Sequence, residues 1–96
     1  MDTQDKMVPS FEEVEALSTK IQVRAMKQQG SVMRFGAAFL NGEILGAWGM
    51  LNKGKETLVS LKNDNIEQSF VIPIPFKEVT SHDVEFTLAF IVLSEC

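Results

Sequence analysis

The sequence predicts an α+β domain in which one N-terminal helix packs on an antiparallel meander sheet of about five strands. Two local signals support this fold class. A capping box begins a helix near residue 10, and an Asn-Gly pair stands between two apolar runs further along. Turn residues then separate more strand-like segments in the second half of the chain. An all-β sandwich or barrel with a small helix is the alternative.

The helix is predicted over residues 10–28. Ser10 and Glu13 have the S-x-x-E spacing of a capping box, and apolar residues recur after them at helical intervals. The segment 21–25 nevertheless alternates between apolar and polar residues. A helix that ends near Lys20 and gives way to a strand is therefore a second interpretation.

Asn41-Gly42 predicts a two-residue hairpin loop. An unbroken register counted outward from this loop places large apolar side chains opposite one another on one face of the hairpin. Small residues fall on the other face. The predicted core residues are Phe35, Phe39, Ile44 and Trp48. We expect the helix to pack on this side.

Three more strands are predicted over residues 56–61, 66–76 and 84–95, with polar turns between the first two and a loop before the third. The last of them is largely apolar on both faces. A strand of that kind is usually covered on both sides. One helix covers one face of a sheet, so the sequence predicts apolar surface in excess of what the helix hides.

The stretch FVIPIPF, residues 70–76, contains Pro73 and Pro75. In an extended strand these prolines remove two amide donors from the same side, so we expect a sheet edge or a strand that runs past its neighbour. No partner strand should pair along that side. The excess apolar residues on the strand faces opposite the core form the predicted interface: Val71, Pro73, Pro75, Ala89, Ile91 and Leu93.

No catalytic residue, cofactor site or metal site is predicted. The chain has one His and one Cys, too few for a structural zinc site, and it contains no glycine-rich phosphate loop. His82 lies between Ser81 and Asp83, but consecutive side chains diverge, so we interpret this segment as a polar loop and not a catalytic triad. Calcium ligation by the Asn-Asp-Asn turn lacks the rest of a binding loop.

Three basic residues fall on one stripe of the predicted helix: Lys20, Arg24 and Lys27. Such a stripe can contact an anion or an acidic partner. Basic residues are also favoured near the C-terminal end of any helix, where they are mostly solvated. The second explanation is the more common one.

The 96 residues suffice for one domain, predicted over residues 10–96 after a polar arm at 1–9. The net charge of −4 argues against nucleic-acid binding. The longest apolar run is too short to span a bilayer, so no membrane partner is expected. The single Cys96 excludes an intrachain disulfide, and we expect a soluble cytoplasmic or otherwise intracellular protein.

These features favour a non-enzymatic protein–protein interaction or assembly module that binds itself, as a homo-oligomer, through an apolar sheet face. A small acidic inhibitor or immunity-type protein that binds a basic partner is a second hypothesis, based on charge and size. A small-ligand-binding domain with its site between helix and sheet, beside Phe35, Phe39 and Trp48, is a third.

Overall fold

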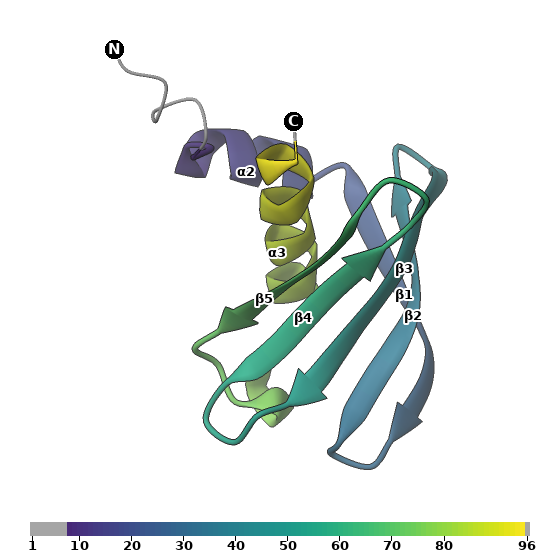
Figure 1. The fold of residues 1–96 in the computed structure, drawn as a ribbon, viewed down its shortest axis with the longest axis vertical. Coiled ribbons are helices and arrows are strands. Elements are labelled where there is room, and N and C mark those ends of the chain that lie inside the picture. Colours follow the sequence, from purple (N-terminus) through teal and green to yellow (C-terminus); the bar gives the residue numbers. More distant parts are fainter. Residues whose placement is uncertain (1–7, 96) are drawn as a thin grey trace.

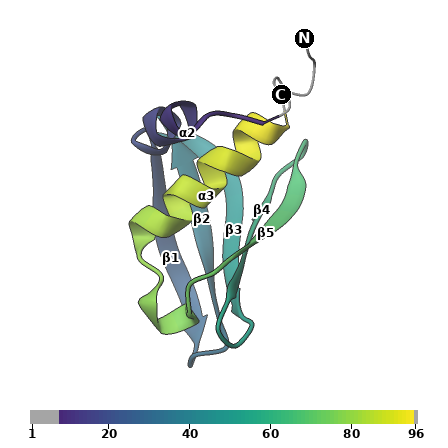
Figure 2. The same ribbon diagram turned by 90° about the vertical axis from the view of Figure 1, so that its left-hand side faces the viewer.

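The described residues 8–95 fold as a five-stranded antiparallel sheet with two α-helices on the same face (Figures 1 and 2). The computed structural model describes residues 8–95, so residues 1–7 of the predicted arm and Cys96 lie outside the described residues. In chain order the elements are α2 (Phe11–Ser18), β1 (Ile21–Gln29), β2 (Met33–Leu40), β3 (Glu43–Asn52), β4 (Thr57–Lys62), β5 (Glu67–Ile72), the 3-10 turn η1 (Phe76–Glu78) and α3 (Ser81–Ser94).

The strands follow one another across the sheet in the order β1-β2-β3-β4-β5. β1 and β5 stand at opposite edges, so the sheet is open. The predicted α+β class with an antiparallel meander is therefore confirmed, and the barrel alternative is wrong. What the prediction lacked is the second helix, α3, which crosses the sheet diagonally beside α2 (Figure 2).

The first helix is shorter than predicted. Its capping box is present, with the Ser10 hydroxyl accepting from the amide of Glu13 at 3.1 Å and the Glu13 carboxylate accepting from the amide of Ser10 at 2.9 Å. The helix ends at Ser18, and β1 begins at Ile21. The prediction of a helix to residue 28 is wrong, because the alternating segment after Lys20 pairs with β2 as a strand.

The hairpin loop forms as predicted, but the register beyond it does not. Asn41 and Gly42 both have positive φ, and Phe39 pairs with Ile44. The ladder then skips one residue of β3, because Ala38 pairs with Gly46. This β-bulge turns the rest of β3 over, since a one-residue slip moves every following side chain to the opposite face.

Two contacts hold the bulge at this position. A Cβ atom on Gly46 would lie 2.5 Å from the carbonyl oxygen of Lys62 on β4, so only glycine fits there without a shift. The side-chain amide of Asn63 donates to the carbonyl of Leu45, the extra residue, at 2.7 Å. The turn between β4 and β5 thus satisfies a carbonyl that the bulge takes out of the regular pairing.

The bulge decides which side chains form the core. Trp48 is 3% exposed and lies on the helix side, where its indole nitrogen donates to the carbonyl of Arg24 at 3.3 Å. Phe35 is 39% and Ile44 68% exposed, and Phe39 is half-buried. Of the four predicted core residues, Trp48 is therefore the one that is buried. The other three were assigned to the core by a register that the bulge breaks.

Residues 84–95 were predicted as a strand, but residues 84–94 belong to α3 and Glu95 is its C-cap. Thr80 caps this helix: its hydroxyl accepts from the amide of Asp83 at 3.1 Å, and the Asp83 carboxylate accepts from the amide of Thr80 at 2.9 Å. The predicted polar loop around His82 is thus the start of a helix. Its apolar side chains point to two sides because α3 packs on the sheet and on α2.

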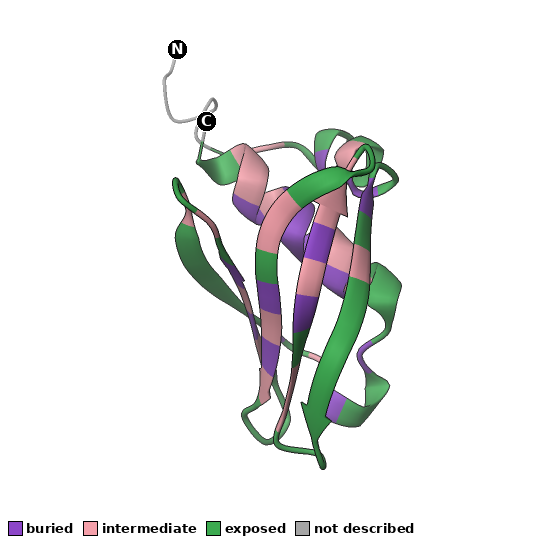
Figure 3. Cartoon of the chain, turned by 90° about the vertical axis from the view of Figure 1, so that its right-hand side faces the viewer, coloured by how far each residue is buried: buried purple, intermediate pink, exposed green. Residues whose placement is uncertain are grey.

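The core lies between α3 and the inner side of the sheet. Its buried residues include Ala38, Trp48 and Met50 from β2 and β3, Val59 and Leu61 from β4, and Val84, Leu88, Ala89 and Ile91 from α3. Val14 of α2 extends it toward the N-terminus. The opposite side of the sheet takes no part in this core (Figure 3).

We predict that Gly46→Ala destabilises the fold by about 1–3 kcal/mol, because the new methyl group meets backbone that cannot move aside cheaply. Urea unfolding followed by circular dichroism measures the loss. Gly49→Ala is the matched control, since its Cβ would meet the flexible Ser60 hydroxyl at 3.4 Å. Equal stability of both variants at one low protein concentration would contradict this account of the bulge.

Candidate functional site

The sheet surface turned away from the helices, here called the outer face, is left uncovered by the described residues 8–95 (Figure 3). The register assigns its residues in rows that run across the strands. Its apolar and small members are Met33, Phe35, Ala37 and Phe39 on β2, Ile44, Ala47, Gly49 and Leu51 on β3, Leu58 on β4 and Val71 on β5. These residues form one continuous apolar surface.

This surface has relief. Phe35 and Phe39 stand on β2 beside a floor of small residues, Ala47 and Gly49, on β3. A shallow hollow of about 200 Å³ lies where β2, β3 and β4 adjoin near the β1–β2 turn. It is lined by Met33, Arg34, Gly49, Met50, Leu51, Leu58 and Ser60. An aromatic ridge next to a small-residue floor is a shape that another apolar surface can fit.

The outer face carries basic residues on β1 and a Lys–Glu pair, Lys62 and Glu67, on β4 and β5. Arg24 and Lys27 are both on this face of β1, since Met26 is bulged out between Ala25 and Lys27. The Arg24 guanidinium stands 5.5 Å from the centre of the Phe39 ring, within range of a cation–π contact. Glu67 is on the same face at the other edge, on β5.

The predicted basic stripe is therefore only partly retained. Arg24 and Lys27 share the outer face of a strand, whereas Lys20 lies in the turn before β1. The predicted anion or partner contact assumed that all three lie on one helix, and this assumption is wrong. Arg24 and Lys27 remain available to a partner that contacts the outer face.

Each edge of the sheet has one feature that opposes an added strand over part of its length. On β1 the amide of Val23 donates to the carboxylate of Glu85 on α3 at 3.2 Å, and the bulge at Met26 interrupts the strand further on. On β5 the pairing stops where Ile72 meets Thr57, and Pro73 follows at once. Such features are typical of edges that do not pair with other chains.

The expectation for FVIPIPF is confirmed in its main point. The segment belongs to an edge strand and runs past the end of its neighbour. The strand is shorter than predicted, because it ends at Ile72, and the carbonyl of Ile74 instead accepts from the Thr57 hydroxyl at 2.7 Å. Pro73 and Pro75 therefore lie beyond the ladder.

The six residues predicted as an interface do not form one surface. Val71 is on the outer face and 44% exposed, and Pro73 is exposed just after β5. Pro75 and Leu93 are half-buried, and Ala89 and Ile91 are 0% and 4% exposed in α3. The assignment of the last three assumed a strand where the chain forms a helix.

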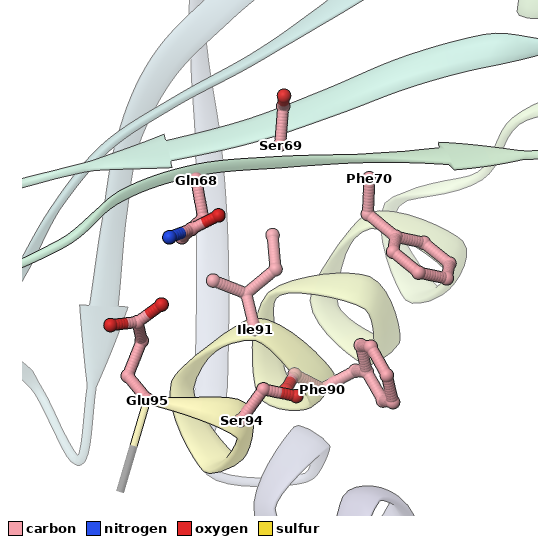
Figure 4. A pocket seen from close by; sticks show the side chains of 7 residues that line it. All are labelled: Gln68, Ser69, Phe70, Phe90, Ile91, Ser94 and Glu95. Carbon is pink, nitrogen blue, oxygen red and sulfur yellow. The ribbon is translucent and has the colours of Figure 1, made fainter. Parts of the chain in front are cut away.

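The helix side of the molecule carries two depressions. The smaller, about 80 Å³, lies between β5 and the end of α3 and is lined by Gln68, Ser69, Phe70, Phe90, Ile91, Ser94 and Glu95. Figure 4 shows Gln68 and Phe70 pointing toward α3 and Ser69 pointing away from it. The ring centres of Phe70 and Phe90, which line this depression, lie 4.9 Å apart.

The larger depression is a groove of about 320 Å³ between α2, the first turns of α3 and the chain after β5. Its walls are mostly apolar: Phe11 and Phe86, whose ring centres are 5.4 Å apart, and Pro73 and Ile74 opposite. His82 lies on the rim and is exposed, and the neighbouring Asp83 is held as a helix cap. The groove thus offers contact surface and no paired nucleophile and base.

The predicted ligand site between helix and sheet does not form from the residues assigned to it. Trp48 is on the inner side of the sheet, whereas Phe35 and Phe39 are on the outer face. Sequence reasoning therefore placed the aromatic residues of the candidate site in the core. The available signal was Gly46, since an isolated glycine inside a strand pattern often marks a bulge.

No group of three or more His, Cys, Asp or Glu side chains lies together within the described residues 8–95 in a way that could hold a metal ion. Neither helix in this part of the chain is long and apolar enough to cross a membrane. Comparisons with protein-family models, with curated proteins and with solved structures give no match to this chain.

We predict that Glu85→Ala exposes the edge amide of Val23 to solvent. Removing a charged acceptor costs about 1.5 kcal/mol locally, so amide hydrogen exchange at Val23 should become roughly tenfold faster. Glu85→Gln keeps a carbonyl acceptor and should retain most of the protection, and Glu78→Ala is a control acid on η1. Unchanged exchange at Val23 in Glu85→Ala would contradict a role for this carboxylate at the edge.

Proposed function

We propose that this protein is a non-enzymatic interaction module that self-associates through its outer sheet face. The observation that carries the proposal is the continuous apolar surface on a sheet face that no described element covers. Contiguous apolar patches of this kind are typical of protein–protein contacts. Phe35 and Val71, 39% and 44% exposed, would be hidden from water by a second copy.

The size of the outer face is sufficient for a stable contact. Five strands that each occupy about 4.8 Å, and three complete rows of side chains that each occupy about 6.7 Å along them, cover roughly 24 by 20 Å. Two such surfaces bury on the order of 1,000 Å² in total, which is where specific interfaces begin. The small residues at its centre favour close contact between two sheets, which normally pack about 10 Å apart.

The protected edges favour a face contact over edge pairing. A strand of another molecule that approached β1 would have to displace the Glu85 carboxylate from Val23. One that approached the end of β5 would meet Pro73, which has no amide hydrogen. Association through the outer face requires neither change.

The absence of enzymatic activity is part of the proposal and has its own support. His82 is the one histidine of the chain, and it is exposed on the rim of the groove. Its neighbour Asp83 already accepts from the amide of Thr80. General acid–base chemistry depends on groups held together at hydrogen-bonding distance from a reacting atom.

Segregated charge favours a second candidate, a small acidic inhibitor-type protein that binds a basic partner through its helix layer. The described residues outside the sheet, 8–20 and 73–95, have seven acidic side chains against two basic ones: Glu12, Glu13, Glu15, Glu78, Asp83, Glu85 and Glu95 against Lys20 and Lys77. Residues 21–72 have more basic than acidic side chains. A one-signed surface attracts partners of opposite charge.

For the first candidate we predict that Phe35→Ser and Val71→Ser each weaken self-association about tenfold. Each removes exposed apolar area worth about 0.6–1.2 kcal/mol per copy, and each change occurs twice in a dimer. Sedimentation equilibrium over a range of concentrations measures the effect, and circular dichroism confirms folding. Met26→Ser is the matched control, because Met26 is 71% exposed on the β1 bulge and outside the outer face. A wild-type protein that stays monomeric at high concentration would overturn the proposal.

For the second candidate we predict that polylysine shifts backbone resonances of α2 and α3 at low salt and that the shifts vanish at high salt, since exposed charges are then screened. Glu12→Gln with Glu15→Gln should reduce the shifts. Glu43→Gln with Glu56→Gln, two acids at turns of the sheet, is the control pair. Shifts confined to the sheet would exclude the helix layer as the binding surface.

A further inference from the structure

We infer that two copies pack outer face to outer face about a two-fold axis that runs along β3, so that β1 of each copy lies over β5 of the other. This inference rests on the proposed self-association and adds its geometry. It places Arg24 of one copy opposite Glu67 of the second copy, twice per dimer. An isologous contact of this kind is the most common arrangement of homodimers.

The register supplies the first argument. One row across the outer face consists of Arg24, Ala37, Ala47, Lys62 and Glu67, one residue from each strand in order. A two-fold axis along β3 reverses the order of strands but keeps the rows. Ala47 then meets Ala47 of the second copy, and the two ends of the row, which have opposite charge, meet each other.

The next rows fit in shape. In the row of Lys27, Phe35, Gly49, Ser60 and Ser69, the axis places the Phe35 ring over Ser60 of the second copy, and Gly49 over its own equivalent. In the row of Gln29, Met33, Leu51, Leu58 and Val71, it places Met33 over Leu58 and the Gln29 side chain over Val71. Phe35 thus meets a small side chain near the centre of the contact, and Met33 meets an apolar one nearer the β1–β2 turn, as close packing of two sheets requires.

Charge excludes the other simple arrangement. A two-fold axis across the strands would place β1 over β1 of the second copy. Arg24 and Lys27 would then gather with the same two basic residues of the other copy, with no acid on β1 to balance them. Like charges brought together at an interface cost affinity.

Sheet twist leaves the Arg24–Glu67 contact within reach. Aligned sheets cross at about 30°, which displaces residues two strands from the axis by about 5 Å along the strand direction. Arg and Glu side chains are long and flexible enough to span that displacement. Arg24 keeps its position 5.5 Å from the centre of the Phe39 ring, at the border of the interface.

The test is charge reversal with mixing. Arg24→Glu and Glu67→Arg should each weaken the dimer about tenfold, because each creates two like-charge contacts. The double variant should recover the wild-type dissociation constant. A mixture of equal amounts of the two single variants should also recover it, because in the mixed dimer both contacts again join opposite charges. Sedimentation equilibrium measures all four samples at low salt.

Lys53→Glu and Glu56→Arg provide the matched control, since they change net charge equally at the turn before β4. Neither should change the dissociation constant, alone or mixed. Recovery in the mixture and double variant supports the axis along β3. Three outcomes overturn it. They are weakening that neither the mixture nor the double variant reverses, no effect of either reversal, and a lower dissociation constant for Arg24→Glu mixed with wild type than for wild type alone. If the Phe35→Ser variant still dissociates the dimer in those cases, the orientation fails and the proposed function stands; a monomeric wild type ends both.

Discussion

The single residue that β3 inserts at Leu45 determines which face of this molecule is core and which is surface. Without it, Trp48 would stand beside Phe35 on one side of the sheet, and the helix side would lose its largest apolar residue. With it, Trp48 and Met50 fill the core under α3, and Phe35 and Phe39 remain on the outer face. The contact of Gly46 with Lys62 and the bond from Asn63 to Leu45 fix this choice in the middle of the sheet.

The second consequence concerns α3. Trp48, Met50, Val59 and Leu61 form an inner side that only a long apolar element can cover, and α3 supplies it with Val84, Leu88, Ala89 and Ile91. Because α3 is used there, and α2 packs beside it, neither helix is left for the other face. The apolar surface of the outer face therefore follows from the placement of two helices on one side.

Local chemistry allowed part of this structure to be predicted. The Ser10–Glu13 capping box, the Asn41-Gly42 loop and the edge position of the proline segment all depend on neighbours in the sequence, and all three are present. The first helix was overextended because residues 21–25 fit both periods and only the ladder with β2 decides between them. α3 was taken for a strand because it is apolar on most sides, although Thr80 and Asp83 have the spacing of a capping box.

The candidate site was the hardest part to predict, since it depends on a long-range contact. The outer face exists because Gly46 approaches a carbonyl sixteen residues later in the chain, at Lys62, and no local pattern contains that approach. Regular alternation of apolar and polar residues on either side of a bulge does not reveal that the two sets of side chains have exchanged faces there. The sequence therefore predicted Phe35, Phe39 and Trp48 on one face, whereas the bulge places Trp48 on the face opposite the other two.

The combination of an open face and protected edges also limits what the proposed association can build. Edge pairing propagates from molecule to molecule, because each added strand presents a new edge. Glu85 at β1 and Pro73 after β5 oppose that route. A contact between two outer faces buries both of them, and no outer face remains exposed for a third copy. The proposed association therefore stops at two copies. Under the proposed self-association, the bulge at Leu45, Glu85 at β1 and Pro73 after β5 therefore act together and favour a finite assembly over a fibre.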